Sequence, residues 1–174
     1  MKNTLHTVMD GLYLACIWTA GMAIFAMSLI IPIGVFARYV LGFGAQWPEP
    51  IAILLMALFT FIGAAAAYRA GAHIAVAMMT DRLAPALQTA CRYLVDLLML
   101  AICLFMIFYG SKLCIETMGQ TLADLPWLPV GISYLPVPVG GFVTLLFVIE
   151  QLVFGAQYHR DIIRFDHQAE ELGA

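Results

Sequence analysis

Residues 11–37, GLYLACIWTAGMAIFAMSLIIPIGVFA, contain no charged side chain. A helix of about 20 apolar residues is long enough to cross the roughly 30 Å hydrocarbon core of a bilayer. A secretory signal peptide has a shorter apolar region of about 7–15 residues and a small-residue cleavage site, and neither is evident here. The stretch therefore predicts an uncleaved membrane-spanning helix, and this sets the fold class of the chain.

The composition of the whole chain agrees with a membrane protein. Of its 174 residues, 63% are hydrophobic and 11% are charged, and the mean hydropathy is +0.94. Soluble domains are about 45–50% apolar and about 25% charged, so this chain has too little charge to cover a soluble surface. The net charge of −3 gives no sign of the basic patch that nucleic-acid binding requires. We expect a single membrane domain over residues 1–174.

Three further apolar runs predict three more spans, at about residues 50–68, 93–111 and 136–154. The third includes Asp96. The fourth is expected to begin near Pro136, because proline is tolerated in the first turn of a helix and disruptive deeper in. The preceding segment, residues 122–136 (LADLPWLPVGISYLP), is predicted to be irregular or re-entrant. The fold class is therefore all-α, with four transmembrane helices.

The segment between the second and third spans is mixed in character. Val76, Met79, Leu83 and Leu87 recur at helical spacing, which predicts a short helix lying along the membrane interface. The alternative is that the second span continues as one long helix. The tail, residues 156–174, mixes charge with Ile162, Ile163 and Phe165, and is expected to be a solvated helix end or a small docking segment.

The positive charges predict the orientation. Four spans leave both termini on one side, and that side would hold six basic residues: Lys2, Arg69, Arg82, Arg92, Arg160 and Arg164. The other side would hold two, Arg38 and Lys112. Because cytoplasmic loops carry the excess of Lys and Arg, both termini are predicted to be cytoplasmic.

The motifs of an enzyme are missing from the sequence. All four histidines fall at or beyond span ends (His6, His73, His159, His167), which disfavours a haem held between membrane helices. Cys16, Cys91, Cys103 and Cys114 are scattered without a CxxC pair, so small buried apolar residues are favoured over disulfide or metal partners. There is no HExxH, no GxSxG and no paired intramembrane carboxylate. We expect no enzyme activity, no cofactor and no metal site.

Transport by this chain alone is also disfavoured. Charged residues inside a bundle usually mark ion pathways, and the candidates are Asp96 and Glu150, each near a span end. Asp96 could instead pair with Arg92 four residues away, and Glu150 could lie at the interface or pair with a neighbour. The chain also lacks two similar halves with broken helices. The sequence indicates an accessory membrane subunit.

Two groups of residues are candidates for contacts with the membrane interface or with another subunit. In residues 38–50 (RYVLGFGAQWPEP), Arg38 and Trp47 could anchor at the outer interface, and Glu49 could pair with Arg38 or with a partner. Gly63 and Ala67 have the small-xxx-small spacing that allows close helix approach. They could serve packing within the chain or contact with another subunit.

Residues 63–76, GAAAAYRAGAHIAV, place Arg69 and His73 four apart, on one face if the helix continues. The pair could be a ligand site, although few companions are evident. It could mark the end of the span, with Arg69 extending to lipid headgroups while Tyr68 lies in the interface. It could also support the turn into the interfacial helix and an interface with a partner. We favour the last two interpretations together.

These motifs together resemble the small membrane subunit of TRAP transporters (tripartite ATP-independent periplasmic transporters, DctQ-like). The resemblance rests on RYVLG followed by Trp47-x-Glu49, on the Arg-x-Gly-x-His-Ile-x-Val string of residues 69–76, and on the Pro136, Pro138 and Gly140 pattern that begins the fourth span. Two positions depart from the family pattern: Pro50 and Ala77 stand where the family often has acids.

The resemblance implies a function and a set of partners. It implies a small subunit of the bacterial inner membrane that braces a large membrane subunit during sodium-coupled uptake of an organic acid. A periplasmic substrate-binding protein would deliver that acid and could contact the outer side of this chain. Two alternatives stay open on the residues alone: a stand-alone four-span structural or channel protein, and the membrane anchor of a redox complex.

Overall fold

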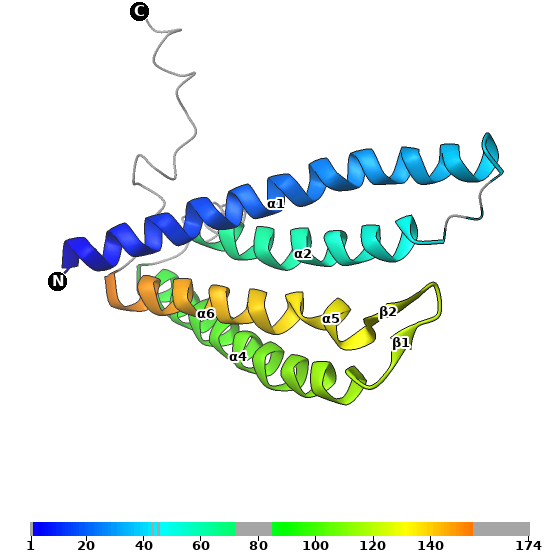
Figure 1. The fold of residues 1–174 in the computed structure, drawn as a ribbon. Coiled ribbons are helices and arrows are strands. Elements are labelled where there is room, and N and C mark those ends of the chain that lie inside the picture. Colours follow the sequence, from blue (N-terminus) through cyan, green and yellow to red (C-terminus); the bar gives the residue numbers. More distant parts are fainter. Residues whose placement is uncertain (1, 43, 45, 72–84, 155–174) are drawn as a thin grey trace, which may run out of the picture.

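The structure is a computed structural model that describes residues 2–42, 44, 46–71 and 85–154. Four long helices dominate it (Figure 1): α1 (Lys2–Tyr39), α2 (Pro48–Arg69), α4 (Pro85–Thr117) and α6 (Pro136–Phe154). All four are long and apolar enough to cross a membrane. The prediction of an all-α membrane protein with four transmembrane helices is confirmed, and α6 occupies the residues predicted for the fourth span.

The second span ends where its last basic residue stands. Arg69 closes α2, the Ala70 amide donates to the Ala66 carbonyl, and Gly71 follows with φ of 74°. Glycine is common at such a helix end because it adopts positive φ without a steric penalty. The alternative in which the second span continues as one long helix is therefore wrong. The predicted interfacial helix lies largely outside the described residues, as do His73 and the tail 156–174.

The segment before α6 is more ordered than the sequence suggested. Strands β1 (Thr121–Leu122) and β2 (Leu125–Pro129) pair antiparallel, and the short helix α5 (Val130–Tyr134) follows. The prediction of an irregular segment is wrong here, while its re-entrant placement stays a prediction. Proline usually breaks regular structure, yet Pro126 and Pro129 lie near the ends of a strand in a two-stranded sheet. An edge strand tolerates proline because its missing amide donor can face away from the partner strand.

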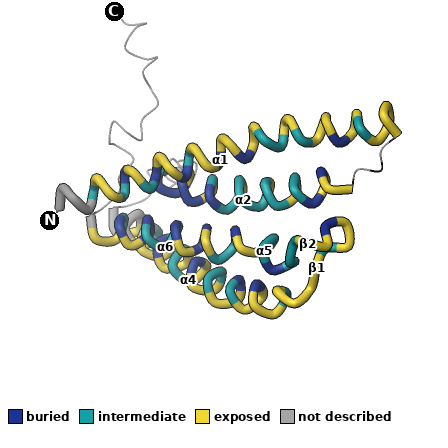
Figure 2. The backbone as a smooth tube through the Cα atoms, viewed as in Figure 1, coloured by how far each residue is buried: buried dark blue, intermediate teal, exposed yellow. Residues whose placement is uncertain are grey.

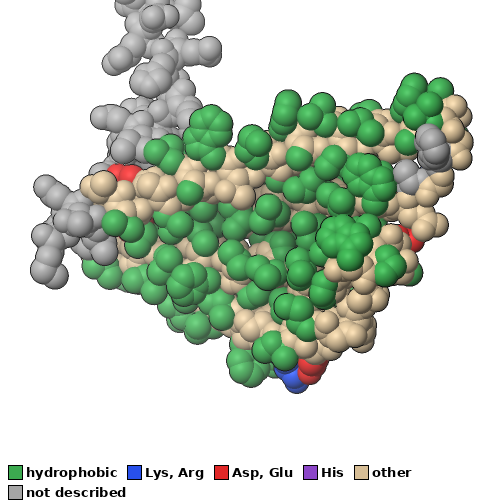
Figure 3. Space-filling view, in the orientation of Figure 1, with side chains coloured by type: hydrophobic (Ala, Val, Ile, Leu, Met, Phe, Trp, Pro, Cys, Tyr) green, Lys and Arg blue, Asp and Glu red, His purple; other side chains and the backbone are tan. Residues whose placement is uncertain are grey.

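The four long helices stand side by side in the order α1, α2, α6, α4, as Figure 1 shows. Thus α6, the last helix of the described chain, lies between α2 and α4. Figure 2 shows buried residues along the seams between helices, while the flanks of α1 and α4 are largely exposed. The face seen in Figure 3 is covered by hydrophobic side chains, and its few charged groups lie near helix ends. Such a surface is expected where lipid is the solvent.

Two adjacent glycines explain how α6 fits between its neighbours. A Cβ added at Gly140 would lie 2.6 Å from the Cβ of Phe61 in α2. A Cβ added at Gly141 would lie 3.0 Å from the Cβ of Met106 in α4. Small residues let helix backbones approach closely within a membrane. One glycine therefore brings α6 against α2, and the next brings it against α4.

Candidate functional site

The most polar place among the described residues is centred on Arg69, at the end of α2. Its side chain is buried, and its Nε donates to Glu150 Oε2 at 2.8 Å. Its Nη2 donates to Glu150 Oε1 and to Asp10 Oδ1, each at 2.8 Å. A guanidinium matches a carboxylate in this two-bond geometry, which is stronger and more directional than a single contact. Arg69 thereby joins α2 to α6 through Glu150 and to α1 through Asp10.

Aromatic rings surround the guanidinium. Its Cζ lies 5.4 Å from the centre of the Tyr13 ring and 5.3 Å from that of Phe147. A cation within about 6 Å of a ring is attracted by the negative face of the ring. Tyr13 and Phe147 are also among the most deeply buried side chains. They shield the ion pairs from water and so strengthen the attraction between the charges.

A second set of contacts extends from the neighbouring residues to α4. Gln151 Nε2 donates to Asp96 Oδ1 at 3.1 Å, and the Tyr68 hydroxyl lies 3.5 Å from the same oxygen. Asp96 is buried, only 4% exposed. Its predicted partner Arg92 has a side chain outside the described ones. Asp96 is thus held by groups from α2 and α6.

The two hydrogen-bonded sets adjoin through the chain neighbours Tyr68–Arg69 and Glu150–Gln151, and we call them together the polar cluster: Asp10, Tyr68, Arg69, Asp96, Glu150 and Gln151. Consecutive residues of a helix point about 100° apart. On α2, Arg69 therefore reaches Asp10 of α1 while Tyr68 reaches Asp96 of α4. On α6, Glu150 bonds Arg69 and the next residue, Gln151, bonds Asp96. The cluster ties all four long helices together at one end. His6 lies beside it, with Nδ1 3.8 Å from Glu150 Oε1.

The polar cluster corrects one interpretation of the sequence and confirms another. Arg69 is 4% exposed and faces α1 and α6, so the interpretation that it extends to lipid headgroups is wrong. Two carboxylates within the chain offer it a closer counter-charge than a headgroup can. Glu150 was expected to lie at the interface or to pair with a neighbour, and it pairs. The expected support from His73 lies outside the described residues.

Asp10 was missed because it precedes the charge-free run that starts at Gly11. A signal was nevertheless present in the sequence. Asp96 and Glu150 stand on two predicted spans and Asp10 directly precedes a third, all toward the membrane side on which Arg69 follows the remaining span. A cation and three carboxylates at one depth of the membrane are expected to pair with each other, because unpaired charges in a membrane are costly.

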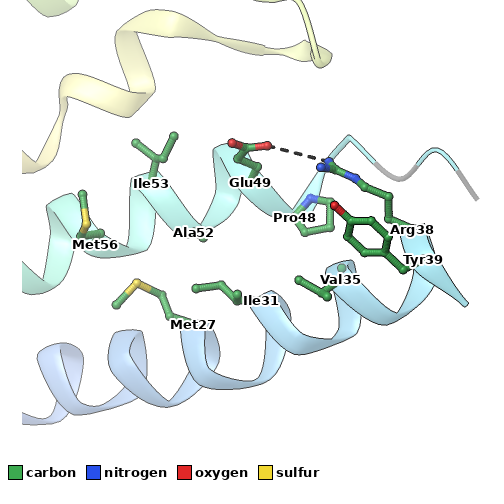
Figure 4. Close-up of a pocket in the computed structure, with 11 residues that line it drawn as sticks. Met27, Ile31, Val35, Arg38, Tyr39, Pro48, Glu49, Ala52, Ile53 and Met56 are labelled. Atoms are coloured by element: carbon green, nitrogen blue, oxygen red, sulfur yellow. Dashed lines mark ion pairs between the residues drawn. The ribbon is translucent and has the colours of Figure 1, made fainter.

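The other sequence-predicted residues lie away from the polar cluster. Arg38 and Glu49 lie at the ends of α1 and α2 that are far from the polar cluster. Arg38 Nη2 is 3.8 Å from Glu49 Oε2, and both side chains are well exposed. Figure 4 shows this pair at the mouth of a groove between the two helices. Trp47 immediately precedes α2 and is exposed.

Gly63 and Ala67 do not act as one pair. A Cβ added at Gly63 would lie 3.8 Å from the Cβ of Ala20 in α1, so this glycine packs within the chain. Ala67 is exposed. Contact of Ala67 with another subunit stays a prediction.

The next question is whether the described residues could form a metal or redox centre. Within them, no three His, Cys, Asp or Glu side chains are grouped closely enough to hold a metal ion. The four cysteines are free thiols, and Cys16, Cys103 and Cys114 are buried, as predicted for small apolar residues. What the polar cluster can do is fix helices relative to one another.

Comparison with known proteins identifies the family. The family model for the DctQ component of tripartite ATP-independent periplasmic transporters matches residues 27–157. A Haemophilus influenzae protein named as a TRAP transporter small permease is 26% identical over 153 residues, covering 88% of this chain and 92% of that protein. The match includes α2, α4 and α6, which carry most of the polar cluster. Membership implies a transport component rather than an enzyme. This multi-pass membrane protein belongs to the DctQ family of TRAP transporter components.

Proposed function

We propose that this chain braces the large membrane subunit of a TRAP transporter in the bacterial inner membrane, with both termini in the cytoplasm. The complex would take up an organic acid by sodium-coupled transport, after a periplasmic binding protein delivers it. The observation that carries the bracing role is the polar cluster, in which Arg69 bonds Glu150 and Asp10 at 2.8 Å each. A moving transport domain needs a neighbour that keeps its shape, and a buried ion network resists sliding of the helices it joins.

The distribution of polar groups favours a structural role for this chain over a role in carrying the ion or the substrate. Arg69 and Glu150 are both almost fully buried and pair with each other, and Asp96 accepts hydrogen bonds from two neutral groups. Carboxylates committed in this way are poorly suited to bind and release a travelling ion. The ion and substrate sites would therefore belong to the large subunit, and the flank of α1 or α4 would lie against it.

Reconstitution tests the bracing role. The large subunit would be placed in proteoliposomes with this chain, without it, or with the variant R69M, and sodium-driven uptake of candidate dicarboxylates and sialic acid would be measured. We expect uptake to need this chain and to fall with R69M, while K112M, which changes an exposed cation, leaves it unchanged.

Two outcomes would contradict parts of this proposal. Full uptake by the large subunit alone would make the brace dispensable. Uptake that persists when choline replaces sodium would remove the sodium coupling while leaving the brace intact. Because R69M could reduce the amount of folded chain, its uptake would be compared at equal amounts of purified complex.

A further inference from the structure

A groove runs along one side of the α1–α2 pair, at the end away from the polar cluster (Figure 4). Its volume is about 410 Å³. Met27, Ile31 and Val35 of α1 line it at four-residue spacing, and Ile53 and Met56 line it from α2. Residues four apart lie above one another on a helix, so the apolar lining follows the helix axes. The groove ends at Arg38 and Glu49.

The length of the groove corresponds to one leaflet. From Met27 to Arg38 the helix rises roughly 16 Å at 1.5 Å per residue. Half of the hydrocarbon core is about 15 Å. An apolar groove of this length, with charged groups only at one end, has the polarity profile of one acyl chain attached to its headgroup.

The mouth of the groove carries one charge of each sign. Arg38 Nη2 and Glu49 Oε2 are 3.8 Å apart, with side chains 49% and 73% exposed. An exposed pair at this distance contributes little stability, so little is lost when other groups enter between them. A second groove, lined by Trp18, Met22 and Leu55 among others, has no charged residue in its lining and so nothing to select a headgroup.

We propose that the α1–α2 groove binds one phospholipid with a zwitterionic ethanolamine headgroup. One acyl chain lies along Met27, Ile31 and Ile53, the phosphate accepts hydrogen bonds from Arg38, and the primary ammonium donates to Glu49. The opposed charges of the headgroup match those of the two side chains. A choline headgroup satisfies Arg38 equally but offers Glu49 no N–H donor, and a glycerol headgroup offers it no cation. The groove is thus selective as well as apolar.

Native mass spectrometry of the full-length chain in mild detergent tests the site. Purified protein would be titrated with palmitoyl-oleoyl phosphatidylethanolamine and, separately, with the matching phosphatidylglycerol and phosphatidylcholine. We expect one ethanolamine lipid to be retained in preference to the other two. R38Q should weaken its retention roughly tenfold, as expected for the loss of one charge-assisted hydrogen bond.

Three further variants separate the parts of the site. E49Q should abolish the preference for ethanolamine over choline while keeping binding of both. I31W should reduce retention of all three lipids, because its side chain fills the groove. K112Q is the matched control: Lys112 and Glu116 also form an exposed pair, at 3.7 Å, but neither lines the groove. Circular dichroism melting would show that each variant is folded.

The proposal is overturned by equal retention in R38Q and K112Q, or by retention of phosphatidylglycerol above phosphatidylethanolamine. It is also overturned if, in the purified complex, a cysteine at I31C stays shielded from maleimide after lipid is removed. That last result would assign the groove to a helix of another subunit. None of these results depends on uptake, so the lipid site can fail while the bracing role stands.

Discussion

Arg69 illustrates when a charge can be buried at the end of a membrane helix. Taking an ion out of water costs several kcal/mol, and good geometry with a counter-ion is needed to offset that cost. Here three hydrogen bonds of 2.8 Å link the guanidinium to two carboxylates. The ion pair therefore contributes less to total stability than to the choice of one arrangement: any other register of α1 against α2 and α6 leaves a charge unpaired.

The first prediction concerns Arg69 itself. R69M leaves Asp10 and Glu150 facing each other without a cation, and we expect the free energy of unfolding in detergent to fall by about 3–5 kcal/mol. The triple variant D10N/R69M/E150Q removes all three charges and should be more stable than R69M alone. Denaturant or thermal unfolding followed by circular dichroism would measure both. A triple variant less stable than R69M would show that the packing of these side chains, and not their charge, matters.

Asp96 should be less sensitive than Arg69. Among the described side chains, its donors Tyr68 and Gln151 are neutral and lie 3.5 and 3.1 Å away. D96N keeps the shape and one acceptor oxygen, and we expect a loss of about 0.5–1.5 kcal/mol in the free energy of unfolding, the value of an ordinary hydrogen bond. The same unfolding measurement would check it. A loss as large as that of R69M would mean that Asp96 carries a charge paired with a strong cation.

At the level of helices, α6 depends on the absence of side chains at its contacts. We expect G140A to destabilise the chain by about 1–3 kcal/mol, the usual cost of overpacking, because the added Cβ would lie 2.6 Å from that of Phe61. G63A is the matched variant, since its Cβ meets nothing closer than 3.7 Å. Unfolding of the two variants in parallel would test this. Equal stabilities would show that α2 and α6 separate easily at this point.

The helices were largely predictable from sequence, and their contacts were not. Long charge-free runs determine spans because each apolar residue adds independently to membrane partition. The start of α6 at Pro136 was predictable for a local reason, because proline fits the first turn of a helix. The partner of Arg69 depends on which helices are neighbours, and the order α1, α2, α6, α4 is set by close approaches such as Gly140 on Phe61. The β1–β2 pair escaped prediction because proline is a poor strand former outside sheet edges.

The order of the helices across the whole chain gives a direct test. The Cβ of Ala20 in α1 lies 3.8 Å from a Cβ built at Gly63 in α2, within the range of about 3.5–4.5 Å that a disulfide needs. In a variant without the four native cysteines, A20C/G63C should therefore cross-link on mild oxidation. A20C/F105C should not, because Phe105 is exposed on α4 at the far side of the row. Electrophoretic mobility without reductant reads out both pairs. A cross-link between α1 and α4 would refute the side-by-side order.

A row of helices differs from a ring in one respect that bears on transport. In the part of the chain that the structure describes, each long helix touches the next and the two outermost helices do not close on each other. Such a layer has two faces and no lumen. A solute travelling along these described helices would have hydrocarbon for one wall, so an aqueous passage beside them needs a further wall, which we expect another polypeptide to supply.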